Sequence, residues 1–234
     1  MTAPLNARNK PFSWSFTALA DYEGCGKRYA ASRFYCTVPF QESAASIWGS
    51  RVHRAGELFL KGIPHKDEEA LLPVEPYCTA ILRTGHKVEA EVEVTLTRGM
   101  APTSWFAKDA WFRAKLDVVV TKVKENSVSL LDWKTGGKIK DAPDQLRLCA
   151  AALAVVRPYL QEFTGKYIWT QHKQVTGIEP ISKIDIPKIW QEFLPRVARM
   201  EGAWRTENFP ARSSGLCPYC GVNDCPQRRG ERRV

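Results

Sequence analysis

The stretch LLDWKTGG, residues 130–137, places an aspartate and a lysine two positions apart at the end of an apolar run. Residues two apart in a strand point to the same face, so Asp132 and Lys134 are expected to project together. Burying a charge is costly unless the charge is paired or bound to something. The pair therefore indicates either a structural salt bridge of Asp132 with Lys134 or Lys115, or a site that uses the charges.

The segments around Asp132 predict an antiparallel meander of three strands. KVEAEVEVTLT, residues 87–97, alternates as a half-buried strand does, and the segments 111–123 and 127–135 follow it, joined by the short polar turn KEN. Pairing of the last two segments would bring Asp117 to the same place as Asp132. Because neighbouring carboxylates repel each other unless a cation lies between them, we expect a hard divalent ion there, Mg²⁺ or Mn²⁺.

Helical patterns lie on both sides of the predicted strands. Helices are expected over residues 15–34, 43–62, 66–82, 143–156 and 186–204, and a fourth strand is expected over 167–173. Gly24 and Gly26 weaken the first helix, and Pro195 is expected to interrupt the last one or delay its start. The order of helices, three strands, helix, strand and helix predicts a compact α/β core with a helical N-terminal lobe.

The helix expected over 43–62 carries a polar stripe, because Gly49, His53 and Glu57 fall four residues apart. A histidine beside an apolar face is most often a hydrogen-bonded core residue, but His53 is also a candidate metal ligand. Gly49, one turn before it, would let another backbone or a strand end come close to the helix.

The motifs GSRVH, AKLDVVV, LLDWKTG and QLRL follow one another along the chain, after the opening run SWSFTALADYEGCGKRY. This ordered set resembles the RecB-like nucleases, a branch of the PD-(D/E)XK superfamily that includes the AddB nuclease domain, CRISPR-associated RecB-like exonucleases and many phage exonucleases. The resemblance spans nearly the whole chain and implies a restriction-endonuclease-like α/β core of order αβββαβ. We expect one nuclease domain over 1–234, with a helical lobe over 1–85, a catalytic core over 86–206 and a metal-binding basic tail over 207–234.

The same resemblance implies roles for individual residues. The implied metal ligands are His53, Asp117, Asp132 and the carbonyl of Trp133, and the implied catalytic residues are Lys134, Asp132, Asp117 and Gln145. One departure is that Cys149 stands four residues after Gln145, where the family often has tyrosine. Glu93, on the polar face of the 87–97 strand, is either simply solvated or a water-mediated metal contact.

Three of the seven cysteines are close together in CPYCGVNDC, as Cys217, Cys220 and Cys225. In a reducing compartment such a group usually binds a metal. The best fourth ligand is Cys25, and the resemblance implies a [4Fe–4S] cluster held by one early and three late cysteines. Spacing alone does not separate this cluster from a structural zinc ion, or from a group that binds no metal. The other three, Cys36, Cys78 and Cys149, are expected to be ordinary thiols.

The chain is basic, with 34 lysines and arginines against 25 acidic residues and a net charge of +9. This balance suggests a polyanionic partner, with nucleic acid first and an anionic membrane second. Candidate DNA contacts near the site are Arg51, Arg54, Lys138 and Lys140, and the end QRRGERRV adds further positive charge. Trp48 and Trp133 are candidates for stacking on a frayed base.

No apolar run reaches the roughly 18 residues of a membrane span, and the N-terminus lacks the apolar core of a signal peptide. We therefore expect a cytoplasmic protein, in the host cytoplasm if it is encoded by a phage. The function expected is that of a metal-dependent DNA exonuclease in phage-type recombination, repair or DNA degradation, with a single-strand annealing or recombination protein as a partner. The alternatives are an endonuclease, a single-strand-specific nuclease, or a non-catalytic DNA-binding assembly module.

Overall fold

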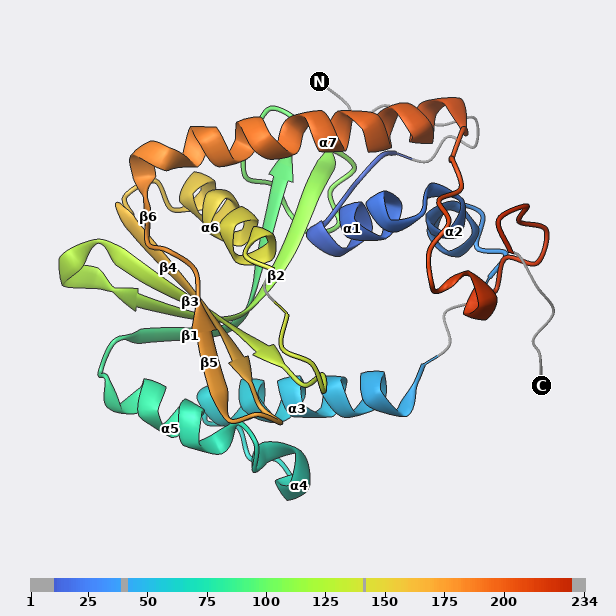
Figure 1. Cartoon of the computed structure of the whole chain (residues 1–234). Helices are drawn as coiled ribbons and strands as arrows, with labels where there is room; N and C mark the ends of the chain where they lie inside the picture. Colours follow the sequence, from blue (N-terminus) through green and yellow to red (C-terminus); the bar gives the residue numbers. More distant parts are fainter. Residues whose placement is uncertain (1–10, 39–41, 141, 229–234) are drawn as a thin grey trace.

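The computed structural model describes residues 11–38, 42–140 and 142–228, and a mixed sheet lies at its centre (Figure 1). The strands of this described part are β1 (Lys87–Thr97), β2 (Ala110–Lys122), β3 (Ser127–Lys134), β4 (Glu162–Trp169), β5 (Gln174–Gly177) and β6 (Ile181–Ser182). Its α-helices are α1 (Phe16–Gly24), α2 (Gly26–Tyr29), α3 (Ala44–Leu60), α4 (Glu68–Leu71), α5 (Glu75–Arg83), α6 (Asp144–Val156) and α7 (Ile186–Thr206).

The predicted meander is confirmed, because β1 pairs antiparallel with β2 and β2 pairs antiparallel with β3. The chain then crosses through α6 and returns as β4, which runs parallel to β3 with Asp132 opposite Tyr167. The strand order is β1-β2-β3-β4-β5, and β6 pairs with β4. The fold is therefore the mixed α/β arrangement with N-terminal helices that the sequence predicted for a restriction-endonuclease-like core.

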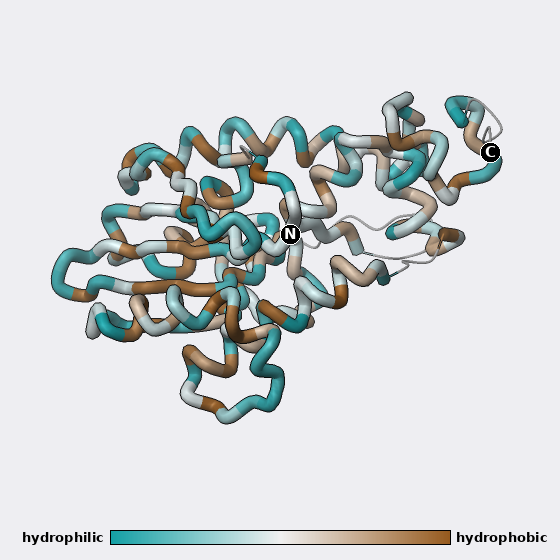
Figure 2. The backbone as a smooth tube through the Cα atoms, turned by 60° about the horizontal axis from the view of Figure 1, so that its bottom comes forward, coloured by the Kyte–Doolittle hydropathy of each residue, from teal (hydrophilic) through white to brown (hydrophobic). Residues whose placement is uncertain are grey.

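Helices cover both faces of the sheet, with α6 and α7 on one side and α3, α4 and α5 on the other (Figure 1). Two apolar cores result. The larger one joins α6, α7 and the N-terminal segment to residues such as Leu130, and the smaller one joins α3 and α5 to residues such as Trp133. Hydrophobic residues are concentrated along the central strands (Figure 2). Successive side chains of β3 point alternately into the two cores. Asp132 and Lys134 point in the same direction as Leu130 of the larger core, so they lie on the face that α6 covers.

Several predicted helices differ from those observed. The 15–34 helix breaks at Cys25, whose backbone is extended (φ −165°, ψ 110°), and ends in a π-helical turn over Ala30–Phe34. The 66–82 segment forms two short helices, because Pro73 lies between them and cannot donate a backbone hydrogen bond. By contrast, α7 continues through Pro195, which is exposed, so water can satisfy the carbonyl that the proline leaves unpaired.

The strands after α6 were also only partly predicted. The fourth strand begins at Glu162, five residues before the expected start, and the short strands β5 and β6 were missed. The helix predicted over 43–62 is confirmed as α3, which begins after a capping box at Ser43 and is followed by Gly62 in the left-handed region (φ 65°).

The segment after α7 returns to the N-terminal helices, and Figure 1 shows it beside α2. The amide of Lys27 donates to the carbonyl of Pro210 at 3.2 Å. A Cβ on Gly26 would lie 2.9 Å from that same carbonyl oxygen, so this approach requires glycine. Residues 229–234, which hold most of the predicted basic end, and the lead-in 1–10 lie outside the described residues. Within the described part, none of the helices combines the length and the apolar character that crossing a membrane requires.

Candidate active site

Asp132 and Lys134 lie side by side, as their shared face predicts, and Gln145 of α6 joins them. The Nζ atom of Lys134 is 2.7 Å from Oδ2 of Asp132 and donates to Oε1 of Gln145 at 3.0 Å. The Nε2 atom of Gln145 donates to Oδ1 of Asp132 at 2.7 Å. The ion pair that the sequence left open thus forms with Lys134, and the glutamine amide orients both of its members.

An aromatic ring lies beside Lys134, but it comes from a strand rather than from α6. The Nζ atom lies 4.8 Å from the ring centroid of Tyr167, within the range of a cation–π contact. The hydroxyl of Tyr167 donates to the carbonyl of Ala142 at 2.7 Å, which fixes the ring. Cys149, at the position where the family often has tyrosine, is a buried thiol. Sequence reasoning missed Tyr167, because only the parallel pairing of β3 with β4 brings it here.

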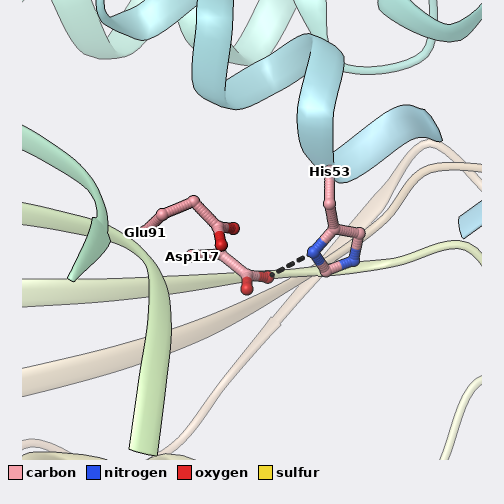
Figure 3. Close-up of side chains that lie close together, drawn as sticks. All are labelled: His53, Glu91 and Asp117. Carbon is pink, nitrogen blue, oxygen red and sulfur yellow. Dashed lines mark ion pairs between the residues drawn. The ribbon is translucent and has the colours of Figure 1, made fainter. Parts of the chain in front are cut away.

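His53 reaches the sheet from α3, which covers the face opposite to α6 (Figure 1), and it lies close to Asp117 (Figure 3). Its Nδ1 atom is 3.3 Å from Oδ2 of Asp117, and its Nε2 atom is 3.1 Å from the carbonyl oxygen of Trp133. The same Asp117 oxygen accepts a hydrogen bond from the Trp133 amide at 2.8 Å. The role expected for Gly49 is confirmed, because a Cβ there would lie 2.9 Å from Oγ1 of Thr135, just beyond the end of β3.

A third group, Glu91, was not among the expected ligands. The pairs Ala90–Val118 and Val92–Leu116 set Glu91 opposite Asp117, and its φ of 57° interrupts the regular strand there. Ligand atoms of His53, Glu91 and Asp117 lie within 4.8 Å of one another (Figure 3). Glu93, the acid considered from the sequence, is exposed.

The site has an excess of negative charge held away from water. Burial, and then the charge of Asp117, raise the pKa of Asp132 to about 6, although Lys134 opposes this. Burial lowers the pKa of His53, but its hydrogen bond and charge interaction with Asp117 outweigh burial and raise it above the ordinary value. Lys134 is close to Oδ2 of Asp132 but not aligned for a hydrogen bond, so this buried oxygen has no hydrogen-bond donor.

These donors fit a divalent cation. Carboxylate oxygens, a peptide carbonyl and an imidazole nitrogen converge from α3, β1, β2 and β3, and oxygen-rich sets of this kind suit Mg²⁺ or Mn²⁺. A cation there would relieve the repulsion between the carboxylates of Glu91 and Asp117.

The four expected DNA contacts fall into two groups. Arg51 pairs with Asp67 and Glu69, and Arg54 pairs with Glu57, so both arginines already have acidic partners along the helical face. Lys138 and Lys140 are exposed just past β3 and form no ion pair with any described residue. Their DNA contacts stay predictions.

Of the two tryptophans considered for base stacking, Trp133 cannot stack on a base, because it is only 2% exposed. It packs in the smaller core, where Gly56 of α3 leaves room for its ring. Trp48 instead is partly buried, and the guanidinium of Arg51 lies over its ring, 5.2 Å from the centroid.

The four cysteines at the two ends of the chain line one small cavity. Cys25 lies at the break between α1 and α2, where its sulfur accepts from the Arg212 amide at 3.4 Å, and the sulfur of Cys217 accepts from the Ser214 amide at 3.2 Å. Basic side chains line the same cavity: Lys27, Arg28, Arg212 and Arg228.

The remaining cysteines differ from this group. Cys78 and Cys149 are buried, and burial raises the pKa of both thiols to about 12. They are therefore inert thiols, as expected for both. Cys36 is exposed at a backbone position with φ 56°, so it is not the buried or half-buried thiol that its scattered position suggested.

Comparison with known proteins agrees with this geometry. Residues 13–225 match the family model described as the PD-(D/E)XK nuclease superfamily, and the chain therefore belongs to that superfamily. Membership in a superfamily of nucleases implies a DNA substrate. The His53–Glu91–Asp117 group could hold a divalent metal ion for the hydrolysis of that substrate.

Solved structures extend the comparison. A protein from Eubacterium rectale, described as a "putative exonuclease", is 14% identical, with a TM-score of 0.55 over 94% of this chain and 91% of that one. Another, SSO0001, is also 14% identical, with a TM-score of 0.42 over 94% and 89% of the two chains. At this identity the first likeness shows the fold alone. No protein with a curated description matches this sequence.

Proposed function

We propose that this protein is a metal-dependent DNA exonuclease of the RecB-like branch, which hydrolyses phosphodiester bonds at DNA ends. The observation that carries the proposal is that His53, Asp117 and the Trp133 carbonyl gather next to the Asp132–Lys134 pair of β3. The description of the Eubacterium rectale protein as an exonuclease is consistent with it. Such an enzyme would act in recombination, repair or DNA degradation, and an annealing or recombination protein stays a predicted partner.

The metal would be held by the imidazole of His53, the carboxylates of Asp117 and Asp132 and the carbonyl of Trp133, with Glu91 as a further ligand. A bound Mg²⁺ or Mn²⁺ would polarise the phosphodiester and lower the pKa of the attacking water. Asp132 contributes in a second way, since its carboxylate keeps the ammonium of Lys134 in place, 2.7 Å away.

Lys134 supplies positive charge at a fixed position. Three groups hold its ammonium, namely Asp132, Gln145 and the ring of Tyr167. A donor held in place stabilises charge that develops on phosphate oxygens without reorganising during the reaction. Gln145 acts through Lys134 and Asp132, so we assign it a positioning role.

We further propose that Cys25, Cys217, Cys220 and Cys225 bind a [4Fe–4S] cluster. Among the described residues, the group around His53 is the only one with three ligand atoms all within 4.8 Å of one another. No three of the four cysteine sulfurs are therefore that close together. Sulfurs on one tetrahedral zinc lie only about 3.8 Å apart, given Zn–S bonds of about 2.3 Å. A larger cluster suits the wider spacing, and it would join the tail to the N-terminal helices.

The test is digestion of DNA by the purified protein. Linear DNA labelled at one end and closed circular DNA of the same sequence are incubated with Mg²⁺, Mn²⁺ or EDTA. We expect the label to be released from linear DNA with either metal, and no cutting of the circle. Nicking of the circle would favour an endonuclease, and DNA binding without any cleavage would favour the non-catalytic assembly module.

A further inference from the structure

A cavity of about 500 Å³ lies beside the candidate active site. Gln145, which contacts both Asp132 and Lys134, forms part of its wall together with Lys115 and Cys149. Trp105 and Arg113 line it as well. The volume falls within the roughly 300–1,000 Å³ that small-ligand sites occupy, which is enough for one or two nucleotides.

The opposite wall is fixed to the sheet. The N-terminal segment pairs with the beginning of β2, where the Trp14 amide donates to the Trp111 carbonyl at 2.9 Å and the Arg113 amide donates to the Trp14 carbonyl at 3.0 Å. Ser13, Ser15 and Thr17 of this segment add polar groups to the cavity lining. The cavity volume of about 500 Å³ therefore suits the end of one strand, one or two nucleotides long.

We propose that this cavity binds the terminal nucleotides of an unpaired DNA strand, with Arg113 and Lys115 contacting phosphates and Trp105 stacking on a base. The proposal rests on the proposed nuclease function and names the substrate form that reaches the site. It concerns residues outside the metal-binding and Asp132–Lys134 groups.

The two cations are arranged along β2 in line with the metal site. Arg113, Lys115 and Asp117 are successive members of one strand face, and residues two apart on a strand are about 6.6 Å from each other. That interval is comparable to the distance between neighbouring phosphates of an extended strand. A phosphate near Asp117 would therefore have its neighbours near Lys115 and Arg113.

Among the basic residues that line the cavity, Arg113 is the one without an acidic partner in the described part of the chain. It is half-buried, its Nε donates to the carbonyl of Trp105 at 2.8 Å, and no carboxylate of the described residues lies within ion-pair distance of it. Lys115 pairs with Glu91 at 2.5 Å, and Arg33, which also lines the cavity, pairs with Asp21 at 2.7 Å. A half-buried guanidinium without an acidic partner is suited to bind a phosphate.

Trp105 lies in the loop between β1 and β2, and its carbonyl accepts from Arg113. Backbone bonds brace the loop, including Thr97 to Ala101 at 2.8 Å, and the Thr103 hydroxyl donates to Asp109 at 3.0 Å. The next residue, Phe106, is 91% exposed. Rings presented in this way stack on bases of any sequence.

The experiment measures binding rather than cleavage. Fluorescence anisotropy in EDTA compares a labelled single-stranded oligonucleotide with a blunt duplex of the same length, for the wild type and the variants Arg113→Ala, Arg113→Lys, Trp105→Ala and Trp105→Phe. Lys124→Ala is the matched control, because it removes one positive charge from the exposed β2–β3 turn. Thermal melting verifies that each variant is folded.

We expect the wild type to bind the single strand more tightly than the duplex. Arg113→Ala and Trp105→Ala should each weaken single-strand binding roughly tenfold or more, and Trp105→Phe should retain most of it. Arg113→Ala should also reduce the slope of log affinity against log salt by about 0.7, the value for one lost phosphate contact on a single strand, whereas Arg113→Lys should keep the slope. Lys124→Ala should change single-strand affinity little.

Folded Arg113 and Trp105 variants that bind like Lys124→Ala would overturn the inference, as would equal affinity for single strand and duplex. Cleavage by the wild type in those cases would leave the proposed nuclease function intact. Conversely, tight single-strand binding that depends on both residues, without any cleavage, would support the cavity site and reject the nuclease function.

Discussion

The Nε2 atom of His53 lies 3.1 Å from the carbonyl oxygen of Trp133, although the two residues are 80 positions apart in the chain. One belongs to α3 and the other to β3, next to Asp132. When the proton of the neutral imidazole is on Nδ1, both of these atoms present lone pairs, so a cation between them would replace repulsion by two coordinate bonds. A protonated His53 would donate to both Trp133 and Asp117, and its hydrogen bond and charge interaction with Asp117 raise its pKa against the opposing effect of burial.

His53→Ala is expected to weaken metal affinity while leaving DNA affinity in EDTA nearly unchanged, because the imidazole is proposed as a ligand and not as a phosphate contact. A Mn²⁺ titration followed by calorimetry measures the change, and we expect a loss of tenfold or more, by analogy with other metal-site substitutions. His172→Ala, in an exposed turn, is the control. An unaltered Mn²⁺ affinity in His53→Ala would return this histidine to a core role.

Metal affinity should rise with pH between about 5 and 8. Both Asp132, with a pKa of about 6, and His53, with a pKa above its ordinary value, must lose a proton before they can bind a cation. Below these pKa values protons compete with the metal, and above them the affinity should reach a plateau. Mn²⁺ titrations at several pH values test this, and an affinity independent of pH over that range would contradict the assignment of both ligands.

Glu91→Gln and Glu93→Gln make a matched pair on one strand. The carboxylate of Glu91 is gathered with His53 and Asp117, whereas Glu93 is exposed. We therefore expect Glu91→Gln to lower metal affinity and the cleavage rate at limiting Mg²⁺ by about tenfold. Glu93→Gln should behave as the wild type. Equal effects of the two substitutions would show that charge along β1, and not ligation, is responsible.

Lys134→Ala and Asp132→Ala should each lower the cleavage rate by roughly a hundredfold or more, the usual effect of removing a positioned charge-stabilising group. DNA affinity should persist, because the residues proposed to contact the DNA backbone, such as Lys138 and Lys140, are unchanged. Single-turnover cleavage and anisotropy separate the two quantities. Lys124→Ala again serves as the control, and near-normal rates in either site variant would remove that residue from the catalytic machinery.

Protein purified without oxygen should be brown, with broad absorption near roughly 400 nm, if a [4Fe–4S] cluster is present. Cys→Ser at position 25, 217, 220 or 225 should bleach the colour and lower the melting temperature, because the cluster would join two ends of the chain. Cys36→Ser should do neither. Colourless protein with one zinc per chain would replace the cluster by a zinc site, and metal-free protein with unchanged melting in the four variants would reject both.

Features that depend on neighbours in the chain were predicted well. The helical pattern over 43–62, the alternation over 87–97 and the polar KEN turn are local signals, and α3, β1 and the β2–β3 pair follow them closely. The breaks in the helices were harder to locate. Cys25 adopts an extended backbone between two glycines, and Pro195 is accommodated because its side of α7 faces water.

The sequence by itself determined the α/β core and the spacing that sets Asp132 and Lys134 on one strand face, because side-chain direction in a strand alternates with a period of two. Only the tertiary structure decided that Glu91 lies opposite Asp117 and that Tyr167 lies beside Lys134. Residues 98–109 connect β1 to β2, and a loop of that length does not specify the register as a two-residue turn would. Glu91 and Tyr167 reach the site through strand pairing, which forms between residues distant in the chain.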